Sequence, residues 1–383
     1  MKKLNRRKFI RNNTIALAAA PLVMGAGLPD TREEEIRPKI QFTRDGLDFS
    51  PNEYSRLLER LTIENNIVDD YSRFGVVERL EKKFATLLGK ESAIFMPTGT
   101  LANHIALRKH AGENRKVLLQ QVSHVYRDTG DGAQTLSGLH LVPLAYDKTS
   151  FTLEDVMSAI ENVSRERVRT GVGAISIESP VRRKNNQVFD YSEMKRISEY
   201  ASNEGIKMHL DGARLHNAVV HTGVPAIEFS SLFDTVYISM YKDFNAASGA
   251  ILAGDDEFTR DLYHTRRMFG GGLPQVWPFA AVALHYADSF EDDYRESLRR
   301  FSAFSSLLNR SGRFKVEQVE NGTNVFRLSV FGTDPETFRQ NLEKVDVSIP
   351  APAGENFFFP KTNNTLLFIE PDELAERFKN ALE

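Results

Sequence analysis

Two residues in the middle of the chain, an acid and a lysine, each follow a short apolar run. The run Met208–Leu210 ends at Asp211, and Lys242 comes shortly after the run Thr235–Met240. Runs of this length, separated by a helical stretch, are typical of neighbouring strands in a parallel sheet. A carboxylate and an amine at two such strand ends are costly to bury unless a ligand lies between them. Taken alone, each residue is better explained by a strand-end turn or an exposed loop.

Pyridoxal phosphate (PLP) is a ligand that needs this pair of groups. Its aldehyde condenses with a lysine amine, and a carboxylate beside its ring nitrogen keeps that nitrogen protonated. The protonated ring withdraws electrons from the α-carbon of an amino acid, so a bond at that carbon breaks more easily. Open α/β sheets bind ligands at the carboxyl ends of their strands. We therefore predict that Asp211 and Lys242 face one cofactor site.

A second candidate binding element lies upstream, where a short strand runs into a turn and then a helix. The turn contains Thr98, Gly99 and Thr100. Backbone N–H groups at a helix N-terminus, with hydroxyls nearby, bind phosphate. A threonine that only caps the helix would give the same pattern. The next strand, Lys116–Gln120, is followed by His124, whose ring can lie on a planar cofactor or simply pack in a loop.

Short apolar runs alternate with helical stretches through the middle of the chain, which predicts βαβ units and a mostly parallel sheet. We predict an α/β fold with a large cofactor-binding domain over 69–288 and a small α+β domain over 289–383. A linker and N-terminal segment over 28–68 precede them. One long helix is expected over Val276–Leu308, and the last strand over Thr365–Ile369.

The composition is that of an ordinary globular protein, with 41% hydrophobic and 26% charged residues and no cysteine. Without cysteine there is no disulfide, no cysteine-bound metal and no thiol nucleophile. No spacing of metal ligands stands out, so we expect no metal site. These features leave a cofactor enzyme that acts on a small molecule as the simplest interpretation.

The first 27 residues have the anatomy of a signal peptide. Six positive charges precede a mild apolar stretch, Thr14–Gly27, which is too short and weakly apolar for a transmembrane helix. Asn5–Arg11 resembles a twin-arginine signal, which directs folded proteins to export machinery. We expect a periplasmic protein without a membrane anchor; if the segment is only a basic tail, the protein is cytoplasmic. The remaining 43 basic and 52 acidic residues, a net charge of −9, argue against nucleic-acid binding.

Several segments between residues 69 and 288 resemble the threonine aldolase / aromatic amino acid β-eliminating lyase family of fold-type-I PLP-dependent enzymes. The C-terminal part resembles this family more loosely. The most specific segment is HLDGARLHNA together with the lysine downstream of it. The other segments are DDYSRFGVVERLE, FMPTGTLANHIAL, SHVYRDTGDGA, SMYKDFNAASGAILAG and RRMFGGGLPQ.

The resemblance implies a role for each matching residue. Lys242 would hold the cofactor as an aldimine and later act as a base, while Asp211 would pair with the ring nitrogen. His124 would stack on the ring, and Arg214 would lie near the ring hydroxyl. It also implies a large domain of the fold-type-I PLP transferase kind and a homodimer or homotetramer whose active sites a neighbouring subunit completes. The residues that would hold the phosphate are Thr98, Gly99 and Thr100.

Three positions depart from the family pattern. Val181 stands where a histidine is usual, Pro274 where an arginine is usual in the glycine-rich segment, and Thr365 where an arginine would bind the substrate carboxylate. Carboxylate recognition favours a bidentate guanidinium. The candidates for a replacement are Arg73, Arg182 and Arg327.

The function predicted first is a PLP-dependent lyase of the threonine aldolase type that cleaves β-hydroxy or other β-substituted amino acids through a Lys242 aldimine. Without the family histidine, His124 or a water must take the β-hydroxyl proton. One alternative is an aminotransferase or decarboxylase, which would use the same Lys242 and Asp211. The other is an exported PLP-fold protein with weakened catalysis, which the missing arginines favour.

Overall fold

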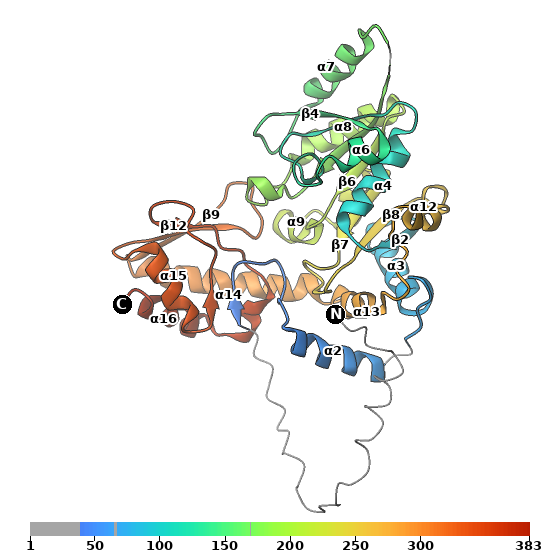
Figure 1. Ribbon diagram of the computed structural model, residues 1–383. Coiled ribbons are helices and arrows are strands. Elements are labelled where there is room, and N and C mark those ends of the chain that lie inside the picture. The colour runs from blue at the N-terminus through green and yellow to red at the C-terminus, as the bar shows by residue number, and fades with distance from the viewer. Residues whose placement is uncertain (1–38, 65–66, 169) are drawn as a thin grey trace, which may run out of the picture. The chain divides into compact units, whose positions relative to one another are not determined.

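The computed structural model describes residues 39–64, 67–168 and 170–383 (Figure 1). The predicted signal peptide and residues 28–38 of the predicted linker and N-terminal segment lie outside these residues. Within the described part of the chain, no helix is both long and apolar enough to cross a membrane.

A seven-stranded sheet in the order β2-β8-β7-β6-β5-β3-β4 forms the centre of the larger part of the fold. All neighbouring strands are parallel except where β8 pairs with β2 and β7. The strands β3, β5 and β7 are buried along their whole length, as expected for a parallel sheet covered on both faces. The strands are β2 Ser92–Met96, β3 Lys116–Gln120, β4 His140–Leu144, β5 Val172–Glu178, β6 Lys207–Asp211, β7 Thr235–Ser239 and β8 Ala250–Gly254.

Helices connect and cover these strands. Helix α4 matters most for the site, because it packs across β5, β6, β7 and β8 and is buried along much of its length. The helices of this part are α2 Pro51–Glu64, α3 Gly75–Leu88, α4 Gly99–Ala111, α5 His124–Arg127, α6 Gly132–Ser137, α7 Leu153–Ser164, η1 Arg182–Lys184, α8 Tyr191–Asn203, α9 Leu215–Thr222, α10 Ala226–Ser231, α11 Asp256–Thr259, α12 Leu262–Met268 and α13 Trp277–Ala287.

The C-terminal part has its own hydrophobic core, which includes Phe304, Phe338 and Phe378. A three-stranded antiparallel sheet in the order β12-β10-β9 packs there, and helix α14 contacts both α9 and α16 (Figure 1). Phe42, just after strand β1 (Ile40–Gln41), joins this core, and β1 pairs in parallel with β11. The elements are α14 Phe290–Arg310, β9 Phe314–Gln318, β10 Phe326–Val330, α15 Pro335–Glu343, β11 Val347–Ser348, β12 Phe357–Phe358, η2 Asn364–Phe368 and α16 Pro371–Asn380.

Two predicted elements were wrong. The single helix expected over Val276–Leu308 is two helices, because α13 ends at Ala287 and α14 begins at Phe290 with three acids in its first turn. Such acids favour a new helix N-terminus. The strand expected over Thr365–Ile369 is the 3₁₀ helix η2, whose start the Asn363 side chain caps by accepting a hydrogen bond from the Thr365 N–H at 2.9 Å. The domain boundary near residue 288 stays a prediction.

Candidate active site

The carboxyl ends of the central strands open into a cavity of about 620 Å³, which we call the sheet-edge cavity. The pairing register places Glu178 of β5 opposite Asp211 of β6, and Asp211 opposite Tyr237 of β7. Residues opposite one another in a sheet point to the same face, so the three side chains enter the cavity together. All seven residues predicted to form the site line this cavity: Thr98, Gly99, Thr100, His124, Asp211, Arg214 and Lys242.

Asp211 is only 2% exposed, so its carboxylate depends on hydrogen-bond donors from the protein. Its Oδ2 accepts a hydrogen bond from Asn103 Nδ2 at 2.7 Å, and its Oδ1 accepts one from the Ala213 N–H at 3.3 Å. Asn103 lies on the buried face of α4, one turn after Gly99. Helix α4 therefore fixes the position of the acid that the sequence singled out.

The hydrogen bonds continue from Asn103 away from the cavity. Asn103 Oδ1 lies 2.9 Å from His209 Nε2, His209 Nδ1 lies 2.8 Å from the Thr235 hydroxyl, and that hydroxyl lies 2.8 Å from His110 Nε2. Burial lowers the pKa of His209 to about 3 and that of His110 to about 4, so both rings are neutral near pH 7. A neutral ring carries one N–H. Because an amide oxygen only accepts hydrogen bonds, His209 carries its proton on Nε2. Each group in this series of hydrogen bonds therefore donates to the next group on the side of Asp211.

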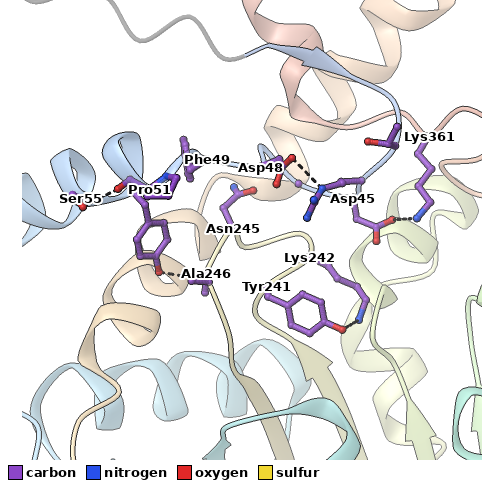
Figure 2. Close-up of a pocket in the computed structure, with 15 residues that line it drawn as sticks. Asp45, Asp48, Phe49, Pro51, Ser55, Tyr241, Lys242, Asn245, Ala246 and Lys361 are labelled. Atoms are coloured by element: carbon purple, nitrogen blue, oxygen red, sulfur yellow. Dashed lines mark hydrogen bonds and ion pairs between the residues drawn. The ribbon is translucent and has the colours of Figure 1, made fainter. Parts of the chain in front are cut away.

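Lys242 lies between two cavities. It lines the sheet-edge cavity and also a second cavity of about 700 Å³, which we call the N-segment cavity because Thr43–Ser55 supplies much of its wall (Figure 2). Its side chain is nearly buried, and Nζ donates to the Tyr241 hydroxyl at 3.1 Å. The two cavities share Asp45, Tyr241, Lys242 and Ala247. A ligand bound to the lysine amine is therefore accessible from both.

The predicted phosphate turn is also the capped start of α4. Thr98 Oγ1 accepts a hydrogen bond from the Leu101 N–H at 3.2 Å, so the capping interpretation holds at this position. The N–H groups that follow open into the sheet-edge cavity at the positive end of the helix. A Cβ on Gly99 would lie 1.9 Å from the Tyr237 hydroxyl oxygen, so only glycine allows the turn to lie against β7. Both properties fit a phosphate cradle.

His124 begins the short helix α5 at the other side of the cavity. Its Nδ1 lies 3.4 Å from Asp128 Oδ2, and the Arg182 guanidinium donates to the same carboxylate at 2.5 Å. Although burial alone would raise it, the hydrogen bonds from Arg183 and Arg182 lower the pKa of Asp128 to about 2. Asp128 is therefore ionised, and it fixes the orientation of the His124 ring.

Two further carboxyl groups face the site and were missed by sequence reasoning. Burial and, to a smaller extent, the nearby Asp211 raise the pKa of Glu178 to about 7, even though the Glu178 oxygens accept hydrogen bonds from the backbone N–H groups of His124 and Arg182. Asp45 behaves in the opposite way: burial alone would raise its pKa, but the Arg214 and Lys361 cations hold it well below its usual range.

Arg214 and Asp45 form a buried ion pair at the cavity wall. Arg214 Nη2 lies 2.9 Å from Asp45 Oδ2, and the two side chains are 5% and 8% exposed. Lys361 Nζ lies 3.2 Å from the other oxygen of Asp45. Arg214 Nε is buried and has no hydrogen-bond partner among the described residues. A buried unpaired donor is costly, so the guanidinium has an N–H available for a ligand.

The positions that depart from the family pattern have ordinary structural roles. Val181 is fully buried, and its N–H donates to the Gln187 carbonyl. The Pro274 carbonyl accepts a hydrogen bond from the Tyr71 N–H at 2.9 Å. Thr365 is buried, and its hydroxyl donates to Asn363 Oδ1 at 2.7 Å. None of these three residues lines either cavity around Lys242.

The residues present fit PLP. The donor set combines a lysine amine, a carboxylate on the neighbouring strand and a helix N-terminus behind a glycine that must stay small. The unpaired Arg214 Nε adds a buried donor suited to an oxygen of the cofactor or substrate. Two indirect contributors, Asp45 and Tyr241, were not singled out from the sequence, and only Tyr241 lies in a segment that resembles the family. Only the nearness of Tyr241 to Lys242 in sequence could have indicated either of them.

Comparison with known proteins agrees with this arrangement. A sequence model of the β-eliminating lyase family matches residues 66–330, so the chain belongs to that family. A low-specificity L-threonine aldolase of Candida albicans is 32% identical over 213 residues, which cover 55% of this chain and 56% of that protein. A probable low-specificity L-threonine aldolase 2 of Arabidopsis thaliana is 28% identical over 71% of this chain and 78% of its own.

A solved structure shares both fold and sequence with the chain. The crystal structure of a putative L-allo-threonine aldolase from Listeria monocytogenes EGD-E matches with a TM-score of 0.73 and 26% identity, over 91% of this chain and 96% of that one. The predicted family and the predicted fold-type-I α/β class are therefore confirmed, and PLP, the cofactor of that family, is the cofactor of this chain. The roles assigned to individual residues stay predictions.

Replacing Asn103 by alanine tests the hydrogen-bond chain behind Asp211. The change leaves Asp211 Oδ2 and the His209 Nε2–H without partners in a buried place, so we expect the free energy of unfolding to fall by about 1–3 kcal/mol. Urea denaturation measures it. The matched control is Asn162→Ala on the exposed face of α7, which should change stability by less than about 0.5 kcal/mol. Equal effects of the two variants on the free energy of unfolding would contradict a structural role for this series of hydrogen bonds.

The buried carboxyl group of Asp243, directly after Lys242, predicts how the free energy of unfolding depends on pH. Burial, with a smaller contribution from Asp45, raises its pKa from 3.8 to about 7. Between these pH values the folded protein keeps a proton that the unfolded chain loses, so this group lowers stability as pH rises from about 4 to 7. Asp243→Asn should therefore be more stable than the natural protein at pH 8, by about 1–3 kcal/mol, and much less so at pH 4.5.

Urea denaturation of the cofactor-free protein at both pH values measures the effect of Asp243→Asn. The control is Asp346→Asn at an exposed position with left-handed backbone that asparagine tolerates. If Asp243→Asn gave no pH-dependent gain over this control, the buried carboxyl would not hold its proton in the folded state.

Proposed function

We propose that the protein is a PLP-dependent carbon–carbon lyase of the threonine aldolase type, which cleaves a β-hydroxy amino acid into glycine and an aldehyde. One observation carries the proposal: Asp211 at the end of β6 and Lys242 shortly after β7 line the same cavity as the turn proposed to bind phosphate. Membership of the β-eliminating lyase family and the names of the relatives support it.

Each group at the sheet edge has a distinct task in this proposal. When bound, PLP supplies the electron sink that lets the bond between the α- and β-carbons break. Asp211 would keep a proton on the ring nitrogen, and Asn103 holds the carboxylate in place through a 2.7 Å hydrogen bond. The turn at Thr98–Thr100 would bind the phosphate, and His124, oriented by Asp128, would contact the ring.

Cleavage also requires a base that removes the proton of the β-hydroxyl. The family histidine is replaced by the buried Val181, and the groups at the cavity that can exchange a proton include His124, Glu178 and Tyr241. The Tyr241 hydroxyl accepts a hydrogen bond from Lys242 Nζ at 3.1 Å, so a proton can pass between the phenol and the amine. We assign the proton of the β-hydroxyl to this pair.

Lys242→Ala tests the proposed function directly. Without the amine the protein cannot bind the cofactor covalently, so we expect the visible absorbance of the bound cofactor and all cleavage activity to disappear. Spectra of the purified protein, followed by product analysis with a panel of β-hydroxy amino acids, measure both. Glycine and an aldehyde support the lyase, whereas a keto acid as the product would make the protein an aminotransferase.

Tyr241→Phe separates the base from the cofactor site. It removes only the hydroxyl, so the cofactor absorbance should be retained while kcat falls by about 10²-fold, the size typical of a lost general acid or base. Tyr146→Phe, at an exposed tyrosine, should change neither quantity. A kcat unchanged by Tyr241→Phe would assign the proton transfer to His124, Glu178 or water.

We also propose that the protein is a homo-oligomer. Tyr71 and Phe74 are 42% and 48% exposed, and Met268 at the end of α12 is 71% exposed. The Arg267 guanidinium lies 5.3 Å from the Tyr71 ring, which brings the two segments together in one partly apolar surface. Light scattering of the purified protein tests this proposal, and the mass of a single chain would refute it.

Export through the twin-arginine route is a further proposal, supported by the Asn5–Arg11 segment. A fusion of residues 1–39 to a reporter that is active only after export in a folded state would test it. Replacing Arg6 and Arg7 by lysine should abolish the signal of this reporter. A reporter that stays in the cytoplasm with the natural segment would show that the segment is not an export signal.

A further inference from the structure

The substrate proposed above carries a carboxylate, and the arginines considered for binding it are not suitably placed. The Arg73 guanidinium lies over the Tyr263 ring at 4.7 Å, and that of Arg327 lies over the Phe357 ring at 4.2 Å. Neither lines a cavity that contains Lys242. Arg182 lines the sheet-edge cavity but not the N-segment cavity, and it shares Asp128 with Arg183 on the side of His124.

Lys361 is a cation close in sequence to Thr365, the position where the family pattern has an arginine that binds the substrate carboxylate. Lys361 lines the N-segment cavity together with Lys242, and Figure 2 shows its side chain reaching Asp45 beside Lys242. The Lys361 side chain is 23% exposed, which leaves the amine accessible from the cavity. Its backbone is fixed at the same time, because its N–H donates to the Phe42 carbonyl at 2.8 Å and it forms an isolated bridge with Val325.

The charges around Lys361 leave one positive charge uncompensated. Asp45 lies between two cations, with Arg214 at 2.9 Å and Lys361 at 3.2 Å, so the three residues together carry a net charge of +1. The buried Arg214 Nε has no partner among the described residues. An anion in the adjoining cavity would compensate this charge.

Geometry places a substrate carboxylate beside this cluster. The amino nitrogen of the substrate must come to the position of the Lys242 amine, and the carboxylate carbon lies two bonds away, at about 2.5 Å. Asp45 lines both cavities that contain Lys242 and binds both cations, so this cluster lies at the wall that the two cavities share beside the lysine amine. The side chain of the substrate can then extend toward Phe49 and Tyr54 of the N-segment cavity.

We propose that Lys361, together with Arg214, binds the α-carboxylate of the substrate, while Asp45 holds the two cations in position. Lys361 is thus a specificity-determining residue that replaces the arginine expected at Thr365. The assignment rests on the proposed function insofar as the substrate is an amino acid. A lysine offers a single charge on a flexible stem instead of a rigid fork, so carboxylate binding here depends more on charge than on geometry.

Spectral titration of the cofactor-loaded protein tests this proposal without requiring turnover. The ligands are L-threonine, glycine and 1-amino-2-propanol, which is L-threonine without its carboxylate. We expect Lys361→Met to keep the cofactor absorbance. It should weaken the binding of L-threonine and glycine about 10- to 100-fold, because a charge-assisted contact is lost. Binding of 1-amino-2-propanol should be unchanged, and Lys361→Arg should restore carboxylate binding to within about threefold.

The matched control is Lys315→Met at an exposed lysine of β9, which should bind all three ligands as the natural protein does. The proposal is overturned if Lys361→Met weakens the binding of all three ligands equally. It is also overturned if Lys361→Met weakens the binding of none of them while Arg182→Gln weakens only the binding of the two ligands that carry a carboxylate. If the natural protein binds L-threonine but forms no glycine, the proposed function fails, and the titration still decides the role of Lys361.

Discussion

The burial of one carboxylate, Asp211, at the end of strand β6 sets the requirements for the rest of the site. A carboxylate that is 2% exposed must be matched by donors on the protein side and by a cation on the ligand side. Helix α4 supplies the donor on the protein side through Asn103. The same helix presents its N-terminus to the cavity and packs its first glycine against Tyr237. One helix therefore sets the distance between the turn predicted to bind phosphate and the carboxylate predicted to face the ring nitrogen.

The opposite wall of the site is built by residues far apart in the chain. Asp45 precedes α2 in the N-terminal segment, Arg214 precedes α9, and Lys361 lies near the C-terminus. They meet because β1 pairs with β11 and because the Lys361 N–H donates to the Phe42 carbonyl. The charge balance at Lys242 thus couples the three parts of the chain, and a change in any one of them alters the electrostatic environment of the amine.

The strands, the parallel sheet and the paired Asp211 and Lys242 could be predicted because each leaves a local pattern of apolar runs that end in polar residues. The break between α13 and α14 was missed because the segment around Asp288 contains neither glycine nor proline. Asp45 and Lys361 could not be predicted, since their importance comes from long-range contacts and neither belongs to a motif. Glu178 lies at a recognisable strand end, but its raised pKa depends on burial beside Asp211 and is invisible in the sequence.

The position of Asp45 also limits how far the protein can be shortened from its N-terminus. Strand β1 begins at Ile40, and the Gly46 backbone lies so close to the Lys242 carbonyl that a Cβ there would come within 2.4 Å of it. Shortening the chain past Ile40 would remove strand β1, and shortening it past Asp45 would also remove the anion that two cations share. The N-terminal limit of the fold and the charge balance at Lys242 therefore lie within one short stretch of chain.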